Sequence, residues 1–165
     1  MVDHDVRVRR VAPADLGGLQ RFYAELSADS RESRFHSGCR GITTRQAETF
    51  ASADHRRRDG FVAVAGGRII GHLVLEPMGD GIEELAVAVD DRAQRSGVGT
   101  LLMAAGVASA RLRHARRLVA WVRAGNTGMR HLLTGSHHPL RLSWEGSIAR
   151  FELDLPGELP GDAAA

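Results

Sequence analysis

The sequence predicts a single α/β domain of the α+β type, with a mixed, mostly antiparallel central sheet flanked by helices on both faces. The chain has 165 residues, about the length of one domain. Residues 60–77 have the pattern of a β-hairpin around Gly66-Gly67, and residues 82–124 follow a strand–helix–strand crossover. We therefore expect one domain over residues 1–156 and a flexible C-terminal tail over residues 157–165.

The N-terminal third begins with alternating apolar and charged residues over 6–13, which is typical of a strand. Pro13 and Asp15 then mark the start of a helix. Residues 27–60 are polar and rich in arginine and serine, and we expect only a short helix near residues 43–53 there. This irregular segment is well placed to shape a specificity surface. The apolar face of the first helix consists of Leu16, Leu19, Phe22, Tyr23 and Leu26.

The second half of the chain returns to regular patterns. Apolar residues at helical spacing predict one long helix, and β-branched runs predict the strands around it. Asn126 precedes a shorter helix as its N-cap. After the hairpin, the predicted elements are a strand over 82–89, a helix from Val98 to about His114, a strand over 116–124, a short helix over 126–135, and two closing strands over 140–146 and 147–156.

The charge of the chain is mildly basic, with a net charge of +2 and a pI of about 9.4. This balance suits a small anionic ligand and does not require nucleic acid. The basic clusters at residues 56–58 and 116–117 have no interleaved aromatic residues, so no base-stacking surface is indicated. All 22 basic residues are arginine, so no lysine of this chain can serve as a nucleophile.

Cys39 is the only cysteine, so we expect no disulfide framework and no cysteine-based metal site. The first residues contain no apolar signal core, and no apolar run approaches the roughly 18 residues of a membrane span. We therefore expect a cytoplasmic protein, either monomer or homodimer, with no metal and with neither a membrane nor a nucleic acid as partner.

Residues 94–100 have features of a phosphate-binding site. Gly97 and Gly99 lie where the chain turns from a strand into a helix, and a helix start presents unpaired N–H groups with a partial positive charge. Alternatively, the glycines serve only to form a tight turn. A P-loop is excluded because it needs a lysine, and a dinucleotide fingerprint is excluded because its third glycine is replaced by Leu102.

The chain resembles the GNAT superfamily of N-acetyltransferases. Residues 89–99 match its acetyl-CoA signature, Gln/Arg-x-x-Gly-x-Gly/Ala after a strand, and the order of elements fits over most of the chain. More narrowly, residues 26–35 and 83–99 resemble bacterial protein-lysine acetyltransferases and their stand-alone relatives. The resemblance implies a GNAT-like fold and direct acetyl transfer from acetyl-CoA to a primary amine. A protein lysine is favoured as the acceptor, and a small-molecule amine is the alternative.

The resemblance also implies where the cofactor binds. Pyrophosphate is expected on the N–H groups of residues 94–100, and the pantetheine arm is expected to follow residues 86–89 by strand-like hydrogen bonding. Asn126 stands where these proteins often place an asparagine that contacts the cofactor. The expected cofactor-binding residues are Ala86, Val87, Ala88, Val89, Gln94, Arg95, Ser96, Gly97, Val98, Gly99, Thr100 and Asn126.

The general base implied by the resemblance is an acidic residue of the signature strand, which falls by position on Glu84. The strand pattern also favours Glu84, because it shares a face with Ala86 and Ala88, and two alanines leave room for a ligand. A carboxylate on a covered strand needs partners or a raised pKa, and a raised pKa suits a base. Two alternatives stay open: Glu83 is the base, or Glu84 is a solvated or arginine-paired residue at a sheet edge.

In the implied mechanism, Glu84 removes a proton from the amine through water, and a backbone N–H near Val87 stabilises the oxyanion. The reaction needs no covalent intermediate, and Cys39 is expected to be structural because it lies in a different segment. Many relatives protonate the leaving thiolate with a tyrosine of the last helix, whereas the only tyrosine here is Tyr23. The substitutes that stay open are His131, Ser136, His137 and His138.

The segment over residues 134–139 replaces the usual Leu-Gly-Phe ending of that last helix. Together with the missing tyrosine, it motivates an alternative function, an acyl-CoA-binding sensor or regulatory module without turnover. The adjacent pair His137-His138 does not form a metal site by itself, because neighbouring side chains diverge and no carboxylate or thiol is spaced to help.

Overall fold

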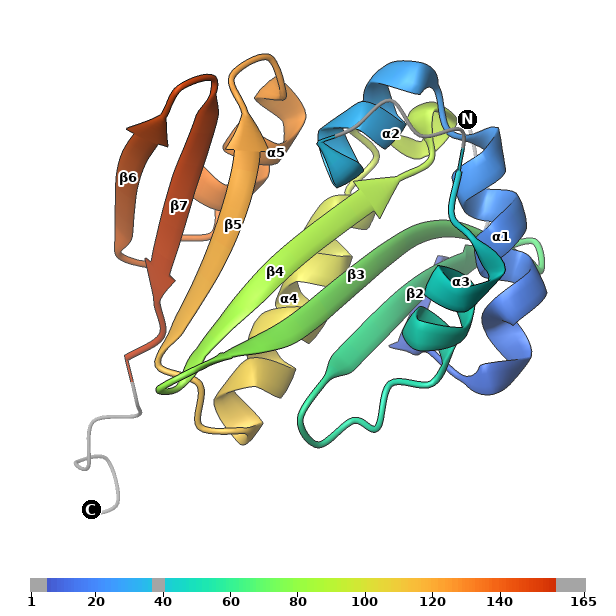
Figure 1. The fold of residues 1–165 in the computed structure, drawn as a ribbon, viewed down its shortest axis with the longest axis horizontal. Coiled ribbons are helices and arrows are strands. Elements are labelled where there is room, and N and C mark those ends of the chain that lie inside the picture. The colour runs from blue at the N-terminus through green and yellow to red at the C-terminus, as the bar shows by residue number, and fades with distance from the viewer. Residues whose placement is uncertain (1–5, 37–40, 157–165) are drawn as a thin grey trace.

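The computed structural model describes residues 6–36 and 41–156, so Cys39 and the predicted tail lie outside the described residues. The described chain alternates strands with α-helices and two 3₁₀ helices (Figure 1). In chain order the elements are β1 (Arg7–Arg10), η1 (Pro13–Asp15), α1 (Leu16–Glu25), α2 (Ala28–Phe35), α3 (Thr44–Ala51), β2 (Asp59–Ala65), β3 (Arg68–Gly79), β4 (Ile82–Val89), η2 (Asp91–Ala93), α4 (Val98–Leu112), β5 (Arg117–Arg123), α5 (Thr127–Thr134), β6 (Leu140–Glu145) and β7 (Ile148–Asp154).

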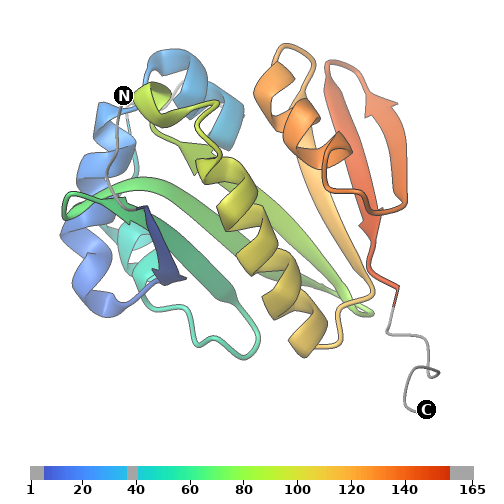
Figure 2. The same ribbon diagram turned by 180° about the vertical axis from the view of Figure 1, so that it is seen from behind.

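All strands of the described chain join one sheet in the order β1-β2-β3-β4-β5-β7-β6. Neighbouring strands are antiparallel except β4 and β5, which are parallel because α4 connects them as a crossover. The helices α1, α2 and α3 cover one face of the sheet, and α4 and α5 cover the other (Figures 1 and 2). The predicted fold class, a mixed and mostly antiparallel sheet between two helical layers, is confirmed.

The β2–β3 hairpin forms around the predicted glycine pair. Gly66 and Gly67 have φ angles of 55° and 75°, the left-handed combination that a type I′ turn requires. Ala65 and Arg68 pair directly on either side of them. The two glycines therefore fix the register of this hairpin at its tip, where an ordinary side chain would strain the backbone.

The helix α2 corrects the prediction that residues 27–60 hold only one short helix. Ser27 caps α2 by accepting a hydrogen bond from the N–H of Ser30, and His36 ends it in a left-handed conformation with φ of 54°. None of its residues is buried, so it has no apolar stripe that periodicity would detect. The second helix of this segment, α3, lies where the sequence predicts it.

Two apolar clusters lie on opposite faces of the sheet. On one face, Leu102 and other α4 side chains pack against β-strand residues such as Leu73 and Leu85. On the other face, α1 packs Phe22 and its neighbours against residues that include Ala88. Because β4 contributes Leu85 to the first cluster and Ala88 to the second, its side chains alternate as the period-two pattern predicts.

The longest helix, α4, has 15 residues and lies along the sheet (Figure 2). Gly106 allows it to approach β3 closely, because a Cβ atom there would lie 2.9 Å from Leu73 Cδ1. No helix in the described ranges is long and apolar enough to cross a membrane.

Candidate functional site

The sheet splits between its two parallel strands. Residues 82–84 of β4 pair with residues 117–119 of β5, and pairing stops there. Beyond that point β4 stays paired with β3 up to Val89, and β5 stays paired with β7 up to Arg123. The two strands diverge toward their C-terminal ends (Figure 1). The backbone edge of β4 that faces β5 therefore lacks a strand partner from Leu85 onward, and it can bind an extended ligand.

The start of α4 lies at the end of β4 and offers free N–H groups. Gly97 is its N-cap, with a φ of 89° and no capping side chain. The helix begins its hydrogen bonding with the N–H of Leu101, which donates to the Gly97 carbonyl at 3.0 Å, so the N–H groups of residues 98–100 have no helical partner. A Cβ at Gly97 would meet nothing within 4 Å. This helix start has the chemistry and the open space to bind an anion.

Polar contacts join the turn before α4 to α2. Asp91 accepts hydrogen bonds from the Ser27 N–H at 2.8 Å and from the hydroxyls of Ser27 and Ser30 at 2.7 Å each. Gln94 Nε2 donates to Ser30 Oγ and to the Val89 carbonyl, both at 3.2 Å. Burial alone would raise the pKa of Asp91, but the hydrogen bonds from the two serines outweigh it and lower that pKa below its usual value. The two segments that carry the narrower resemblance thus contact each other.

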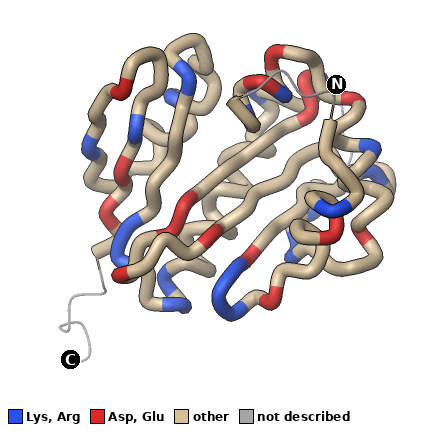
Figure 3. The backbone as a smooth tube through the Cα atoms, viewed as in Figure 1, with Lys and Arg blue, Asp and Glu red and all other residues tan. Residues whose placement is uncertain are grey.

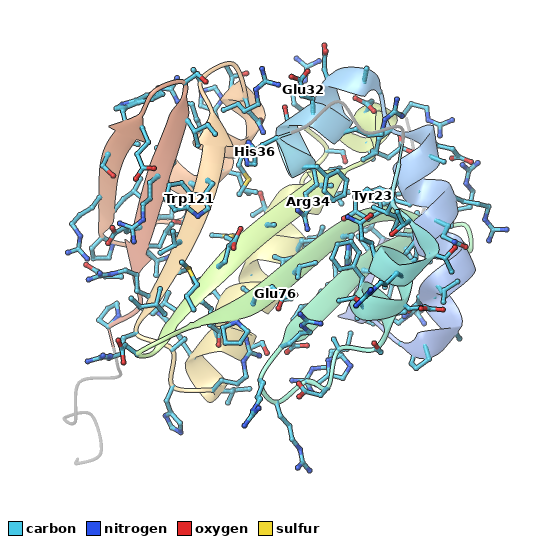
Figure 4. All side chains as sticks on the ribbon, in the orientation of Figure 1. Tyr23, Glu32, Arg34, His36, Glu76 and Trp121 are labelled. Atoms are coloured by element: carbon cyan, nitrogen blue, oxygen red, sulfur yellow. The ribbon has the colours of Figure 1, made fainter. Side chains whose placement is uncertain are left out.

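The helix α2 also reaches the other side of the split. Glu32 forms an ion pair with Arg123 at the end of β5. Figure 4 shows Glu32 on α2 at the end of the sheet where β4 and β5 have separated. Because Asp91 ties α2 to the β4 side and Glu32 ties it to β5, the helix lies across the ends of both strands.

The predicted cofactor residues of the strand and of the turn lie along the end of β4, the turn after it and the start of α4. Ala88 and Val98 have buried side chains, so their backbone groups are what a ligand can reach. Arg95 is exposed and has a φ of 60°, and Ser96 Oγ donates to the Ala93 carbonyl at 2.6 Å. Gln94 uses its amide within the turn. At the buried positions only the backbone is available to a ligand, whereas the turn also has exposed side chains such as that of Arg95.

Asn126 lies apart from the other predicted cofactor residues, at the start of α5 beyond β5. Its Oδ1 accepts a hydrogen bond from the Met129 N–H at 3.0 Å, which confirms the predicted cap. The helix α5 nevertheless approaches the glycine turn, because a Cβ at Gly99 would lie 3.5 Å from Leu132 Cδ2. This approach is made by Leu132 in the last turn of α5, whereas Asn126 lies at the opposite end of that helix.

Glu84 lines a cavity of about 350 Å³ on the face covered by α2 and α3. Ala86 lines it too, and Glu76 of β3 lies directly opposite Glu84 in the strand register. Glu76 pairs with Arg58 at 2.8 Å, whereas Glu84 is half-buried and has no hydrogen bond or ion pair with the described residues. Figure 3 shows neighbouring acidic segments of β3 and β4 in the middle of the sheet. An unpartnered carboxylate in a cavity is available to accept a proton from a ligand.

Glu83, the alternative base, points to the opposite face. Arg113 donates to both of its carboxylate oxygens, at 3.0 and 2.5 Å, and also to Asp59 at 2.9 Å. Asp59 is fully buried, and it accepts further hydrogen bonds from Ser109 and His55. Burial alone would raise the pKa of Asp59, but these bonds hold it below its usual value. Glu83 belongs to a buried ion network at the end of α4 and lines no part of the cavity.

None of the predicted substitutes for the missing tyrosine lines the cavity. His131 and His137 are exposed, Ser136 donates to the Leu133 carbonyl at 2.7 Å, and His138 lies 3.3 Å from Arg111. Tyr23 is fully buried, with its hydroxyl 2.8 Å from His72 Nδ1. Within the described ranges, no group of three or more His, Cys, Asp and Glu side chains is arranged to hold a metal ion.

Two cavity residues, Glu76 and Arg34, are not indicated by the sequence patterns. Glu76 is acidic and lies near the end of a predicted strand. This pattern predicts an exposed side chain, but it does not predict that Glu76 is a neighbour of Glu84. Arg34 lies in α2, within the segment that resembles protein-lysine acetyltransferases. The sequence patterns do not predict α2, so they cannot place Arg34 at the cavity.

A family model described as the acetyltransferase (GNAT) family matches residues 20–135, most of the chain. Among solved structures, the GNAT domain of S. lividans PAT is 28% identical, with a TM-score of 0.85 over 91% of this chain and 90% of that chain. No match was found among the curated proteins.

Two further solved structures share the fold at lower identity. The phosphinothricin acetyltransferase of Sinorhizobium meliloti in complex with AcCoA is 17% identical, with a TM-score of 0.75 over 96% of this chain and 90% of that chain. The structure of yncA from Salmonella typhimurium with its cofactor acetyl-CoA is 16% identical, with a TM-score of 0.75 over 96% of this chain and 99% of that chain. Both extend the likeness over nearly the whole chain.

Proposed function

This chain belongs to the acetyltransferase (GNAT) family, and on that premise we propose that it transfers an acetyl group from acetyl-CoA to a primary amine with Glu84 as the general base. One observation carries the proposal: Glu84 is an unpartnered carboxylate in a cavity, and pairing between β4 and β5 stops at this same residue. The acceptor then approaches from the cavity and the acetyl group from the split.

The start of α4 and the free edge of β4 are the proposed cofactor site. The N–H groups of residues 98–100 and the positive end of a 15-residue helix complement a pyrophosphate. The unpaired edge over residues 85–89 complements the amide groups of a pantetheine arm. The solved structures from Sinorhizobium meliloti and Salmonella typhimurium, both complexes with acetyl-CoA, support acetyl-CoA as the ligand. Asn126 is proposed to contact the cofactor from the α5 side.

Glu84 is proposed to activate the acceptor. A primary amine with a pKa near 10.4 is protonated at neutral pH and cannot attack a thioester in that form. Glu84 accepts one proton from the ammonium, directly or through a water molecule. The free amine then attacks the carbonyl carbon, so that a C–N bond forms, the C–S bond breaks, and the second proton of the attacking nitrogen passes to solvent. A backbone N–H near Val87 stabilises the developing oxyanion.

A dedicated general acid is not required for this transfer. The leaving group is a thiolate, and an alkyl thiol has a pKa of roughly 8.5, so the thiolate leaves without full protonation. Tyr23 is fully buried and none of the candidate histidines lines the cavity, and solvent can protonate the thiolate after it leaves. The absence of a tyrosine in α5 is therefore compatible with turnover.

A protein lysine is the favoured acceptor within this proposal. The segment that resembles protein-lysine acetyltransferases includes α2, and α2 forms a wall of the cavity through Arg34 and Phe35. The cavity opens to the surface, so the end of an extended side chain can reach Glu84 from a separate protein. A small-molecule amine of similar reach is the alternative.

A thiol-release screen tests the proposed transfer. Acetyl-, propionyl- and succinyl-CoA are each offered with lysine peptides, polyamines and aminoglycosides, and free CoA is measured against a control without acceptor. We expect acceptor-dependent release with acetyl-CoA. Tight binding of acetyl-CoA without release for any pair would contradict the proposal and support a sensor or regulatory module.

A further inference from the structure

The cavity beside Glu84 holds unbalanced charges of both signs. On its strand side, Glu84 has no ionic partner among the described residues, whereas Glu76 is neutralised by Arg58. On its helix side, Arg34 projects from α2. In Figure 4 Arg34 lies between α2 and the strands, beside Tyr23, and Glu76 lies further along β3 on the same face. The cavity thus presents one free carboxylate and two guanidiniums to a ligand, the partly buried one of Arg34 and the exposed one of Arg45.

Arg34 has no carboxylate partner within residues 6–36 and 41–156. Its guanidinium lies 4.9 Å from the ring centre of Phe35 and 5.7 Å from that of Phe50. Its Nε is buried and makes no hydrogen bond. A partly buried cation without a counter-ion is costly, and an anion that binds there recovers that cost.

The groups that face Arg34 from the core do not neutralise it. Tyr23 and His72 are both fully buried. Burial, followed by the positive charge of Arg34, lowers the pKa of His72 to about 3, so His72 is neutral at pH 7. Burial also raises the pKa of Tyr23, with Arg34 acting in the opposite direction, so Tyr23 keeps its proton. The positive charge at this wall of the cavity is therefore uncompensated.

We propose that the acceptor amine carries an anionic group of its own, and that Arg34 binds this anion while Glu84 receives a proton from the amine. This assignment rests on the acetyl transfer proposed above. Phe35, Phe50 and Ala86 line the same cavity and suit the aliphatic part of such a ligand. The cavity, at about 350 Å³, is at the small end of sites that bind small molecules.

Two kinds of acceptor combine a primary amine with an anionic group. One is a free amino acid or a similar amine with its own carboxylate. The other is a protein lysine with an acidic neighbour, which supplies the anion from the next side chain. Both place a primary amine and an anion on one short aliphatic frame, and acceptors with and without the anion distinguish them.

The test compares acceptors that differ only in the anion. β-Alanine, γ-aminobutyrate and Nα-acetyl-lysine are each assayed against their own carboxamides, and a peptide with Lys-Glu is assayed against the same peptide with Lys-Gln. We expect kcat/KM to favour the anionic member roughly ten- to a hundredfold, mainly through KM, because a hydrogen-bonded charge pair contributes that much. A preference confined to the amino acids identifies a small molecule, and one confined to the peptides identifies a protein lysine.

Variants assign the preference to Arg34. Arg34→Gln is expected to bring the anionic-to-neutral ratio close to one, and Arg34→Lys is expected to restore part of it. Arg21→Gln removes the same charge from an exposed position on α1 outside the cavity and is the matched control for net charge. Thermal unfolding of each variant checks the packing of Arg34 on Phe35 and Phe50.

Equal kcat/KM for both members of every pair in the wild type would overturn the inference while leaving the acetyl transfer in place. A preference that survives Arg34→Gln but is lost in Arg45→Gln, the other cavity arginine on the helix side, would also overturn it. If no acceptor turns over, the same pairs are titrated by calorimetry against protein saturated with CoA. If only the anionic member binds, and Arg34→Gln abolishes that binding, the anion site is supported even though the transfer has failed. If both members bind equally, the anion site and the acetyl transfer are both rejected.

Discussion

Glu84 of β4 lies directly opposite Glu76 of β3, and the two carboxylates line the same cavity. A β-bulge between Pro77 and Gly79 sets this relationship. In a regular antiparallel register that continued from the Gly79–Ile82 pair, Glu76 would instead lie opposite Leu85, and its side chain would be on the face covered by α4. The extra residue therefore moves one acidic side chain from the core face to the cavity face, and it gives the cavity two carboxylates with different partners.

Gly97→Ala is expected to weaken acetyl-CoA binding roughly tenfold or more, because a methyl group would stand where phosphate oxygens approach the N–H groups of α4. It also costs about 1–2 kcal/mol of stability, since Gly97 is left-handed. Gly66→Ala is the matched control, because Gly66 is also left-handed, has open space around it and lies in the β2–β3 turn. Calorimetric titration of both variants with acetyl-CoA measures the difference. Equal Kd values for acetyl-CoA in the two variants would show that the glycine turn is not part of the cofactor site.

Arg113→Met is expected to destabilise the fold by about 3–5 kcal/mol, because it leaves Asp59 and Glu83 buried without their shared cation. Arg68→Met, which breaks an exposed pair with Glu25, is the control and is expected to cost at most about 1 kcal/mol. Urea unfolding gives both free energies of unfolding. Similar small losses in the two variants would show that the network does not depend on Arg113.

His72 is expected to make stability depend on pH. Burial lowers its folded-state pKa from 6.5 to about 3, so between these values the unfolded chain binds more protons and the free energy of unfolding falls as pH decreases. From pH 6.5 to pH 5 the wild type should lose about 1–2 kcal/mol more than His72→Gln, which has no imidazole to titrate. Urea unfolding at both pH values measures the two losses. Parallel losses would mean that His72 already takes up its proton in the folded state.

Local patterns in the sequence predict most of the fold, because they report contacts with near neighbours in the chain. The Gly66-Gly67 turn, the apolar face of α4 and the alternation along β4 each need only a few consecutive residues to be recognised. The glycine turn before α4 is local in the same way, so a few residues around Gly97 are enough to indicate a candidate anion site.

The helix α2 and the composition of the cavity could not be predicted in this way. α2 has no apolar stripe, and it is held by Ser27 and Ser30 contacts to Asp91, which lies about sixty residues further along the chain. Glu76 lies opposite Glu84 only because of a β-bulge, and no residue pattern in the sequence predicts that bulge. The sequence also left Glu83 and Glu84 open as bases, since only the register shows which of them Arg113 neutralises.

Glu84→Gln tests the central claim most directly when it is measured beside Glu83→Gln. For Glu84→Gln we predict an unchanged Kd for acetyl-CoA and a kcat lower by roughly 10²- to 10⁴-fold at pH 7, the usual contribution of a general base. Its residual rate should rise steeply with pH, as the acceptor amine loses its proton without help. Glu83→Gln should lose stability but keep the kcat of the folded enzyme. Wild-type kcat in Glu84→Gln, or a loss of kcat only in Glu83→Gln, would contradict the assignment of the base.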